Sequence, residues 1–311
     1  MPATSLSIVI PSFNAAATLP RAILSCVDWV DAAKIFVVLD GPDAESQEAA
    51  RCVEGVQVIA LDQRSGAPAC RNAGLARVTT DYVMFLDADD YIVGSFLLDA
   101  QRVAQAQAAD LVLGRFAFEW PSGRREFREP LDEYGIGDNA VILRRWLLNR
   151  YTPPCAVVWN ADFVRSLGAW DEALAKNQDG DIIYRALMAG ARVAFGERGA
   201  GVYVQSDNPG RITRQQSPRA LSSQLMVLDR IRSRLDTLPG EVAEPLALAY
   251  YGVARHAYTA QVDDLAETAE RSARELGLSG EPGELHHTLL ASALGLRGKQ
   301  RLTQKVRSAL S

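Results

Sequence analysis

The sequence predicts an α/β fold in which a mostly parallel, Rossmann-like sheet is sandwiched by helices and followed by an all-helical extension. Short β-branched, apolar runs alternate with helical stretches through the first hundred residues, which is the pattern of parallel strands joined by helices. Each run is continuously apolar, as strands covered on both faces are. The extension is predicted because helix formers dominate after Pro218. Apolar residues then recur at helical spacing, as at Leu221, Leu225, Leu228 and Ile231.

The elements of the first half follow one another closely along the chain. Strands are expected at residues 7–10, 35–39, 56–60 and 82–86. A helix after the first strand begins with Thr18 as its N-cap and tolerates Pro20 in its first turn, with Ile23, Leu24 and Val27 on one face. A short helix is expected at 69–76. We interpret residues 1–95 as a nucleotide-binding half.

The second half is predicted to complete this domain. An apolar, alternating run at 111–118 predicts a strand, and helical character resumes at 139–148 and 180–189. Turn-forming residues make 206–210 a loop. We therefore expect a main domain at 1–217, with its acceptor-binding half at 96–217, and a helical extension at 218–311.

Composition and charge narrow the class of protein. With 48% hydrophobic and 23% charged residues, the 311-residue chain resembles an ordinary globular protein. A formal net charge of -5 argues against nucleic-acid binding, because a phosphate backbone favours a basic face. We expect no signal peptide and no membrane-spanning helix, and hence a cytoplasmic protein. Four cysteines lack zinc-site spacing and are expected to be reduced core thiols: Cys26, Cys52, Cys70 and Cys155.

The strongest local signal is a group of three carboxylates in four residues, Asp87, Asp89 and Asp90, directly after the strand expected at 82–86. Such a concentration of negative charge costs stability, and a divalent cation is the simplest compensator. A D-x-D pair can hold Mg²⁺ or Mn²⁺ through one or two carboxylates while nucleotide phosphates complete the coordination. The alternative is a solvated acidic turn.

Candidate nucleotide-binding residues follow the first two strands. The first strand runs into Pro11, Ser12, Phe13 and Asn14, and the second into Asp40. Parallel strands end at a common edge, where ligands bind in α/β proteins. The Asp40 carboxylate could accept a hydrogen bond from a pyrimidine N3–H, while residues 11–13 line the base and ribose. The alternative is that all of these are turn residues.

Four segments, in this order, resemble the family 2 glycosyltransferases: Pro11-Ser12-Phe13-Asn14, Leu39-Asp40-Gly41-Pro42, residues 66–74 and Asp87-Ala88-Asp89. The resemblance implies the GT-A fold, a nucleotide-diphosphate sugar donor, in particular a UDP-sugar, and transfer with inversion. It implies that Asp89, helped by Asp87, holds Mn²⁺ or Mg²⁺, and that Arg71 lies near the donor pyrophosphate. Two positions depart from the family pattern, Leu39 in place of an acidic residue and Cys70 in place of alanine.

Two later segments, 168–172 and 177–185, resemble the family's acceptor-side motifs. The resemblance implies that Asp179 is the general base. Gln178 replaces the usual glutamate, and Asp181 would cap the following helix or bind the acceptor, a glycan or a lipid-linked sugar. The alternative for Asp179 is a helix N-cap.

Further binding residues are suggested by position. Trp159 and Asn160 fit the family's acceptor-side wall, because an aromatic ring stacks on a sugar face; the alternative is core packing. Arg211 and Arg214 resemble the segment that closes over the donor diphosphate, or they belong to a solvated basic loop.

The end of the chain offers a further prediction, and two rival functions stay open. From residue 285 onward there is no acidic residue, and Leu302, Val306 and Leu310 recur every fourth position. This basic amphipathic helix could contact anionic lipid at the inner face of the membrane, or it could be a solvated terminal helix. The rival functions are a noncatalytic sugar-nucleotide-binding or assembly partner and a nucleotidyltransferase of similar fold.

Overall fold

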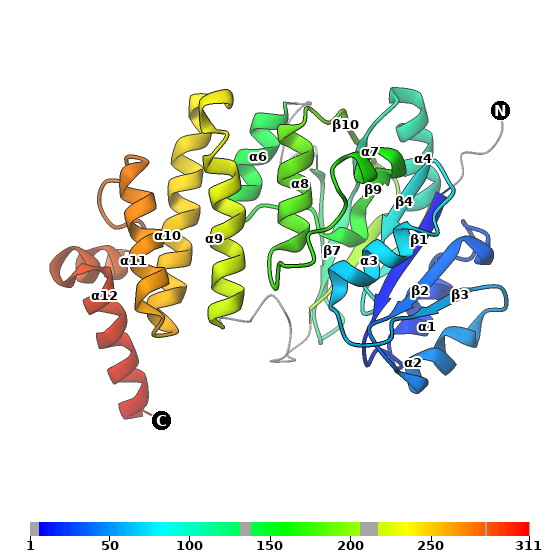
Figure 1. Ribbon diagram of the computed structural model, residues 1–311, viewed down its shortest axis with the longest axis horizontal. Helices are drawn as coiled ribbons and strands as arrows, with labels where there is room; N and C mark the ends of the chain where they lie inside the picture. Colours follow the sequence, from blue (N-terminus) through cyan, green and yellow to red (C-terminus); the bar gives the residue numbers. More distant parts are fainter. Residues whose placement is uncertain (1–5, 131–137, 206–216, 284, 311) are drawn as a thin grey trace. The chain divides into compact units, whose positions relative to one another are not determined.

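The computed structural model describes residues 6–130, 138–205, 217–283 and 285–310 (Figure 1). The chain falls into two compact units. A sheet unit comprises Met1–Val141, Tyr151–Glu172 and Ile182–Asn208, and a helical unit comprises Ile142–Arg150, Ala173–Asp181 and Pro209–Ser311. The helical unit therefore combines the predicted extension with two short segments from the predicted acceptor half.

The sheet unit is built on a seven-stranded sheet with the order β10-β6-β9-β4-β1-β2-β3. Its strands are β1 (Leu6–Ser12), β2 (Ile35–Leu39), β3 (Gln57–Ala60), β4 (Tyr82–Phe85), β6 (Leu111–Leu113), β9 (Val157–Asn160) and β10 (Val193–Phe195). All neighbouring pairs are parallel except those that β9 makes with β4 and β6. The predicted α/β fold with a mostly parallel sheet is confirmed.

Alternate residues of β1 and β2 pack against helices on opposite faces of this sheet. Ile8 and Ile10 belong to a buried cluster that includes Ile23 of α1 (Leu19–Leu24). On the other face, Gly74 of α3 (Ala67–Leu75) approaches Val9 so closely that a Cβ atom at Gly74 would lie 2.3 Å from Val9 Cγ1. A side chain at Gly74 would push α3 off the sheet.

A second sheet of four strands has the order β5-β11-β7-β8. It contains β5 (Tyr91–Val93), β7 (Phe116–Glu119), β8 (Arg125–Arg128) and β11 (Ala200–Val204). The strand predicted at 111–118 is therefore two strands, β6 and β7, that belong to different sheets. The chain changes sheet at Gly114, where a Cβ atom would lie 2.2 Å from the ring of Phe96. Only glycine fits this close approach, which the apolar pattern does not encode.

Helices complete the sheet unit. They include α2 (Ala44–Ala49), α4 (Phe96–Gln107), α7 (Ala161–Ser166) and α8 (Gln178–Met188), whose first turn belongs to the helical unit. α6 (Asn139–Leu147) also spans the division between the units. Short 3-10 turns lie at η1 (Ala32–Lys34), η2 (Ala50–Cys52) and η3 (Pro154–Ala156).

Three local predictions are corrected by the structure. Thr18 precedes α1, but its side chain makes no capping hydrogen bond and instead donates to the carbonyl oxygen of Ala15. Leu24, the last residue of α1, is 52% exposed, so it does not share the buried face of Ile23. Cys52 is exposed at the end of η2, whereas Cys26, Cys70 and Cys155 are buried as predicted.

The helical unit places α9 (Pro218–Arg232), α10 (Ala243–Thr259) and α11 (Asp263–Glu275) side by side (Figure 1). The short turns η5 (Leu235–Thr237) and η6 (Gly240–Val242) connect α9 to α10. The apolar residues that predicted α9 are all buried: Leu221, Leu225, Leu228 and Ile231. The helical period therefore identified the buried face of this helix.

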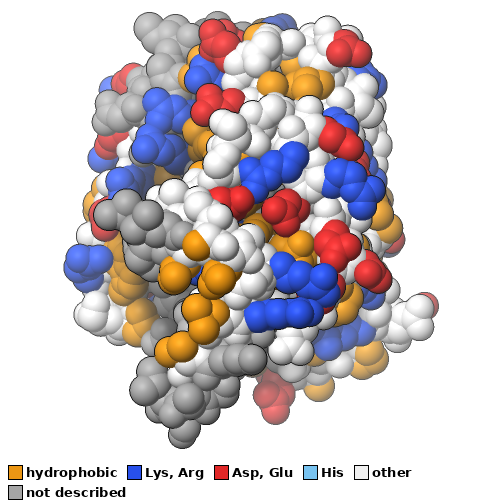
Figure 2. Space-filling view, turned by 90° about the vertical axis from the view of Figure 1, so that its left-hand side faces the viewer, with side chains coloured by type: hydrophobic (Ala, Val, Ile, Leu, Met, Phe, Trp, Pro, Cys, Tyr) orange, Lys and Arg blue, Asp and Glu red, His pale blue; other side chains and the backbone are white. Residues whose placement is uncertain are grey.

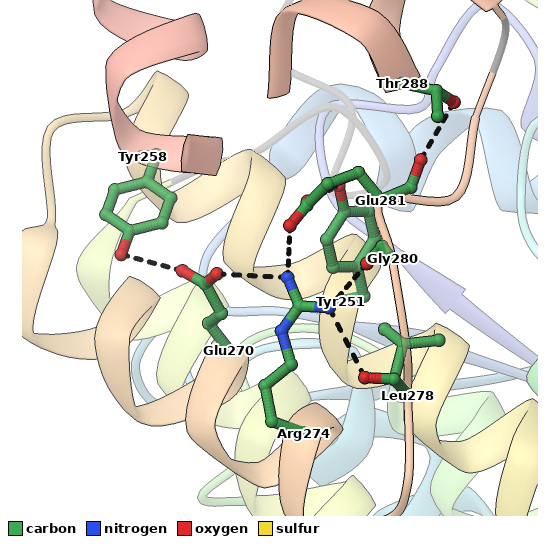
Figure 3. A network of polar contacts seen from close by, with 8 residues as sticks. All are labelled: Tyr251, Tyr258, Glu270, Arg274, Leu278, Gly280, Glu281 and Thr288. Atoms are coloured by element: carbon green, nitrogen blue, oxygen red, sulfur yellow. Dashed lines mark hydrogen bonds and ion pairs between the residues drawn. The ribbon is translucent and has the colours of Figure 1, made fainter. Parts of the chain in front are cut away.

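Arg274 of α11 lies at the centre of a polar network in the helical unit (Figure 3). Its guanidinium contacts the carboxylates of Glu270 and Glu281 and donates to carbonyl oxygens in the segment that follows α11. Tyr251 of α10 donates to Glu281 at 2.6 Å, and Tyr258 donates to Glu270 at 3.0 Å. The network ties this segment to two helices, so we assign it to stability.

The last helix, α12 (Leu285–Leu310), is interrupted at Gly295, where φ is 70°. Arg297 and Arg301 pair with Asp263 of α11, and Arg297 also pairs with Glu267. Figure 2 shows Lys and Arg side chains interleaved with Asp and Glu side chains on this side of the molecule. The two arginines are thus engaged within the helical unit. Among the described residues, no helix has the length and apolar character required to cross a bilayer.

Candidate active site

Three neighbouring parallel strands, β1, β2 and β4, end at the same edge of the main sheet, which we call the carboxyl edge. Ser12 pairs with Leu39, and Val9 pairs with Phe85. The amide of Asp40 donates to the Ser12 carbonyl oxygen at 2.8 Å, immediately beyond the β2 pairing. The structure therefore gathers the predicted segments after these three strands at one place.

Asp87 is held at this edge by Arg71. Arg71 lies on α3 with its side chain 3% exposed, and its Nη2 donates to Asp87 Oδ1 at 2.7 Å. Its guanidinium also lies 5.7 Å from the ring of Trp170. A buried guanidinium that donates to a carboxylate in this way fixes the orientation of that carboxylate. The Arg71 side chain, predicted to reach the pyrophosphate, is directed at Asp87 in this structure.

The three clustered carboxylates have different surroundings. Asp87 and Asp89 are partly exposed, whereas Asp90 is fully buried. Asp90 Oδ1 accepts a hydrogen bond from the amide of Val204 at 2.9 Å, which fastens the end of β11 to the carboxyl edge. The backbone carbonyl oxygen of Asp89 accepts a hydrogen bond from Arg21 at 2.8 Å. Asp90 therefore has a structural contact, while Asp87 and Asp89 are the carboxylates of the cluster that solvent reaches.

Cys155 lies buried beside these carboxylates. Burial, together with the negative charges of Asp90, Asp87 and Asp89, raises the pKa of the Cys155 thiol well above its ordinary value. The thiol is therefore protonated at neutral pH, and it adds no negative charge to the cluster.

The loops after β1 and β2 present one aromatic ring and one carboxylate. Phe13 is 42% exposed, and the amide of Asn14 donates to Asp43 Oδ2 at 2.8 Å. Asp40 Oδ1 accepts from the amides of Ser65 and Gly66 at 2.6 and 2.8 Å. One oxygen of Asp40 is thus already used to position the loop before α3, and Oδ2 is the oxygen closer to Arg64.

Asp43 supports the same region from the start of α2. Burial acts to raise the pKa of Asp43, but hydrogen bonds from Ser46 and Asn14 outweigh it and place the pKa below its ordinary value. Asn14 adopts a positive φ of 49°, a conformation that asparagine tolerates better than most residues. The backbone of the Phe13 loop is therefore held by an ionised carboxylate.

Asn72 joins α3 to the Gly-Ala-Trp-Asp-Glu segment at 168–172. Its Oδ1 accepts from the amide of Trp170 at 3.0 Å, and its Nδ2 donates to the Trp170 carbonyl oxygen at 3.0 Å and to Glu172 Oε1 at 2.8 Å. The Trp170 ring packs on Phe85 with a centroid distance of 4.1 Å. Asn72 thus links two of the sequence segments that carry the predicted site.

Asp179 and Asp181 lie in the first turn of α8 but have different surroundings. Asp181 is 1% exposed, and its Oδ1 contacts Arg230 of α9 at 2.6 Å. Asp179 is partly exposed. The N-terminus of a helix favours a negative charge at both positions. The Asp181 carboxylate is buried against Arg230, which favours the alternative of a structural role at the start of α8 over contact with the acceptor.

Residues 7–160 match the family model described as glycosyl transferase family 2. This region places the chain in glycosyl transferase family 2. It contains the carboxyl edge, with Phe13, Asp40, Arg71, Asp87 and Asp89.

Curated relatives of this chain have varied descriptions. The pre-mycofactocin glycosyltransferase of Mycobacterium tuberculosis is 28% identical over 200 residues, which are 61% of this chain and 40% of that protein. The poly(ribitol-phosphate) beta-N-acetylglucosaminyltransferase TarP of Staphylococcus aureus is 26% identical over 121 residues, or 37% of each chain. The chain therefore spans about 40% of the length of the pre-mycofactocin relative.

Solved structures share the fold over most of the chain. S. aureus TarS 1-349 in complex with UDP-GlcNAc superposes with a TM-score of 0.58 at 14% identity, covering 88% of this chain and 92% of that chain. The same protein in complex with UDP gives a TM-score of 0.53 at 18% identity, covering 90% and 95%. These likenesses confirm the predicted GT-A type fold.

The structure places Trp159 and Asn160 away from the predicted acceptor wall. Trp159 is 3% exposed in the centre of the main sheet and packs against Trp170. Asn160 caps α7 by accepting a hydrogen bond from the amide of Phe163, and it pairs with Tyr82 at the beginning of β4. It therefore lies at the edge of the sheet opposite Asp87. The assignment of these two residues to an acceptor wall is corrected.

Two of the residues predicted to contact the nucleotide are also internal to β1. Pro11 and Ser12 are buried within the strand, so their side chains do not line a base or ribose, whereas Phe13 and Asn14 are exposed. Ala88 is 7% exposed between the two partly exposed aspartates. Arg211 and Arg214 lie outside the described residues.

Three contacts at the carboxyl edge were not anticipated from the sequence. They come from Arg21, which binds the Asp89 backbone, from Arg64, which covers Phe13, and from Asn72 as the partner of Trp170. Asn72 lies inside one of the segments that resemble the family, and this position could have marked it as a residue of the site. Arg21 and Arg64 lie on the first helix and on a loop, and no local pattern distinguishes them from solvated arginines.

The prediction of a divalent cation at this edge depends on the oxygens of Asp87 and Asp89. Among the described residues, no group of three or more His, Cys, Asp or Glu side chains is arranged to hold a metal ion. Mg²⁺ bound with a nucleotide needs only one or two protein carboxylates, because the phosphates supply further oxygens. Arg71 holds Oδ1 of Asp87, so Oδ2 is the oxygen that a cation could take, and Asp89 is partly exposed two residues later.

Proposed function

We propose that this chain transfers a sugar from a UDP-sugar to a hydroxyl group of a glycan or lipid-linked acceptor, with inversion at the anomeric carbon. The observation that carries the proposal is the composition of the carboxyl edge, where an exposed aromatic ring and the Asp40 carboxylate follow β1 and β2 while Asp87 and Asp89 follow β4. The first pair suits a pyrimidine, and the second suits a cation on a diphosphate.

The base end of the proposed donor site uses Phe13 and Asp40. An exposed ring can stack on any base, whereas a fixed carboxylate distinguishes bases by their N–H groups. Two backbone amides hold Asp40 in position, so its orientation does not depend on the ligand. The UDP and UDP-GlcNAc complexes of TarS support a uridine nucleotide as the first choice of ligand.

The phosphate end uses Asp87 and Asp89. When bound there with the donor, Mn²⁺ or Mg²⁺ would take up negative charge on the departing diphosphate. Arg71 fixes the Asp87 carboxylate from the buried side, so this ligand is oriented before the donor arrives. Arg21 fixes the Asp89 backbone in the same way.

The proposed general base is Asp179, on the evidence of its sequence motif and its partly exposed position in the first turn of α8. Its carboxylate accepts the proton of the acceptor hydroxyl as that oxygen forms a bond to the anomeric carbon. The bond from this carbon to the diphosphate breaks on the opposite side, and UDP leaves with the bonding electron pair. A single displacement of this kind inverts the configuration.

A test of the donor is a thermal-shift titration with UDP and UDP-GlcNAc, each with Mn²⁺ and with EDTA. Ligands that bind the folded state raise the melting temperature by mass action. We expect a larger shift with Mn²⁺, and release of UDP from UDP-GlcNAc or from another UDP-sugar when an acceptor is present. Equal shifts with and without metal would remove the metal from the proposal.

The outcome also separates the enzyme from a noncatalytic sugar-nucleotide binder. Both would give a metal-dependent shift with UDP, but only the enzyme would release UDP faster than the Asp179→Asn variant does. Binding without any difference in turnover between wild type and this variant would favour the binder.

A further inference from the structure

A single side chain, that of Arg64, covers both groups of the proposed base site. Its guanidinium carbon lies 3.8 Å from the centroid of the Phe13 ring. Its Nε lies 3.8 Å from Asp40 Oδ2. Arg64 therefore contacts the exposed ring and the carboxylate at the same time.

The backbone of Arg64 is fixed while its side chain is not enclosed. The two residues that follow Arg64 donate their amides to Asp40 Oδ1. A Cβ atom at Gly41 would lie only 3.1 Å from the Arg64 nitrogen, so the β2 end and this loop are in close contact. The Arg64 side chain is nevertheless 69% exposed. It can therefore leave the ring without disturbing the loop that carries it.

We infer that the Arg64 guanidinium occupies the position of the nucleotide base and must be displaced when the base binds. A guanidinium is planar, it stacks on aromatic faces, and its N–H groups point outward in its plane. It thus resembles a pyrimidine whose N3–H faces a carboxylate. The inference rests on the proposed function, and it assigns Arg64 as a residue that sets the affinity and selectivity for the base.

The displacement has a definite consequence for binding. If the ring is free only part of the time, the apparent dissociation constant of the base is raised by the inverse of the free fraction. A solvent-exposed cation–π contact corresponds to a factor of about 2 to 5 in such an equilibrium. Removing the guanidinium is therefore expected to tighten base binding, whereas removing an ordinary ligand contact would weaken it.

Uridine is the probe that isolates this effect, because it carries the base and ribose without phosphate. We expect Arg64→Ala to bind uridine about 3- to 6-fold more tightly than wild type in an NMR titration, because the inverse of the free fraction is one plus that factor. In the wild type, the Arg64 Nε–H resonance should lose its ring-current shift as uridine is added. The matched control is Arg51→Ala, an exposed arginine paired with Glu48, which should leave uridine affinity unchanged.

Three results would overturn the inference, and they differ in what they say about the proposed function. Weaker uridine binding by Arg64→Ala would mean that Arg64 is a contact to the base, and unchanged binding would mean that it does not compete. Metal-dependent binding of UDP by the wild type in either case would leave the proposed function standing. If neither uridine nor UDP bound to any variant, with or without Mn²⁺, the proposed donor site and the inference would fail together.

Discussion

The carboxyl edge and the segment from β9 to α8 were both predicted from the sequence to form the site. The structure brings the predicted residues together at the carboxyl edge, but it gives most of those in the other segment internal partners. At the carboxyl edge, Phe13, Asp40, Asp87 and Asp89 follow three neighbouring strands and come together. In the other segment, Trp159, Asn160 and Asp181 are occupied by packing, capping and an ion pair.

Strand direction explains much of this difference. β1, β2 and β4 are parallel, so the residues that follow them reach the same edge. β9 runs antiparallel to β4, which carries Asn160 to the opposite edge. A residue at the end of a strand can thus be assigned to a site only when the direction of that strand is known.

The largest effect that tests this comparison concerns Asp179 and Asp181. We expect Asp179→Asn to lower the rate of sugar transfer by about 10²- to 10⁴-fold, the usual effect of a general base, with little change in UDP binding. Asp181→Asn should mainly destabilise the protein, because it removes the buried negative charge that pairs with Arg230. Transfer rates and melting temperatures of both variants would show this. If Asp181→Asn lost transfer while Asp179→Asn retained it, the roles would be exchanged.

A second comparison separates the two carboxylates of the carboxyl edge. Asp89→Asn should reduce the Mn²⁺-dependent part of the UDP thermal shift more than Asp87→Asn does. Asp87→Asn should in addition lower the free energy of unfolding by about 1–3 kcal/mol, because it weakens the charged hydrogen bond of the buried Arg71. Thermal shifts and urea unfolding without ligand distinguish the two effects. Equal losses of stability in the two variants would contradict the role given to Arg71.

Asp99 of α4 is a carboxylate of the sheet unit that has no assigned part in the reaction, and it provides a purely structural comparison with the carboxyl edge. Burial acts to raise the pKa of Asp99, but hydrogen bonds from Arg102 and from the amides of Glu197 and Arg198 outweigh it and lower the pKa. A carboxylate with a lowered folded-state pKa stabilises the fold above its unfolded pKa. This contribution is lost as the pH falls through the folded pKa.

We therefore expect Asp99→Asn to be less stable than wild type by about 1–3 kcal/mol at pH 7. The difference should shrink as the pH falls below about 4, near the ordinary pKa of aspartate. Urea unfolding at several pH values would measure it. Asp162→Asn is a suitable control, since the Asp162 side chain is 91% exposed. If the difference in the free energy of unfolding between wild type and Asp99→Asn stayed constant with pH, it would not come from the ionised Asp99 carboxylate.

The smallest expected effect concerns Asn160, which the structure assigns to the cap of α7 and not to the acceptor wall. Asn160→Ala should cost about 1 kcal/mol of stability through loss of the α7 cap, with unchanged kcat and acceptor KM. Asn160→Ser, which can still cap, should recover most of the stability. A raised acceptor KM in both variants would return Asn160 to the acceptor site.

Much of the fold was available from the sequence because it depends on local periodicity. Continuous apolar runs identified β1 to β4, and helical spacing identified the buried face of α9. The apolar run at 111–118 predicts one strand, but the structure has two: β6 pairs with β9 and β10, and β7 pairs with β8 and β11. Which partners a strand meets is decided by segments elsewhere in the chain, and no local pattern reports it.

The sequence by itself determined which chemical groups follow the strands of the carboxyl edge: an aromatic ring after β1 and carboxylates after β2 and β4. Only the tertiary structure decided which of these groups meet solvent and which have internal partners. Arg71 binds Asp87, Asp90 binds the end of β11, and Arg64 covers Phe13. The physical reason is that the energy of a charged or aromatic side chain depends on the partners it meets in space. Here those partners come from segments that are distant in the chain.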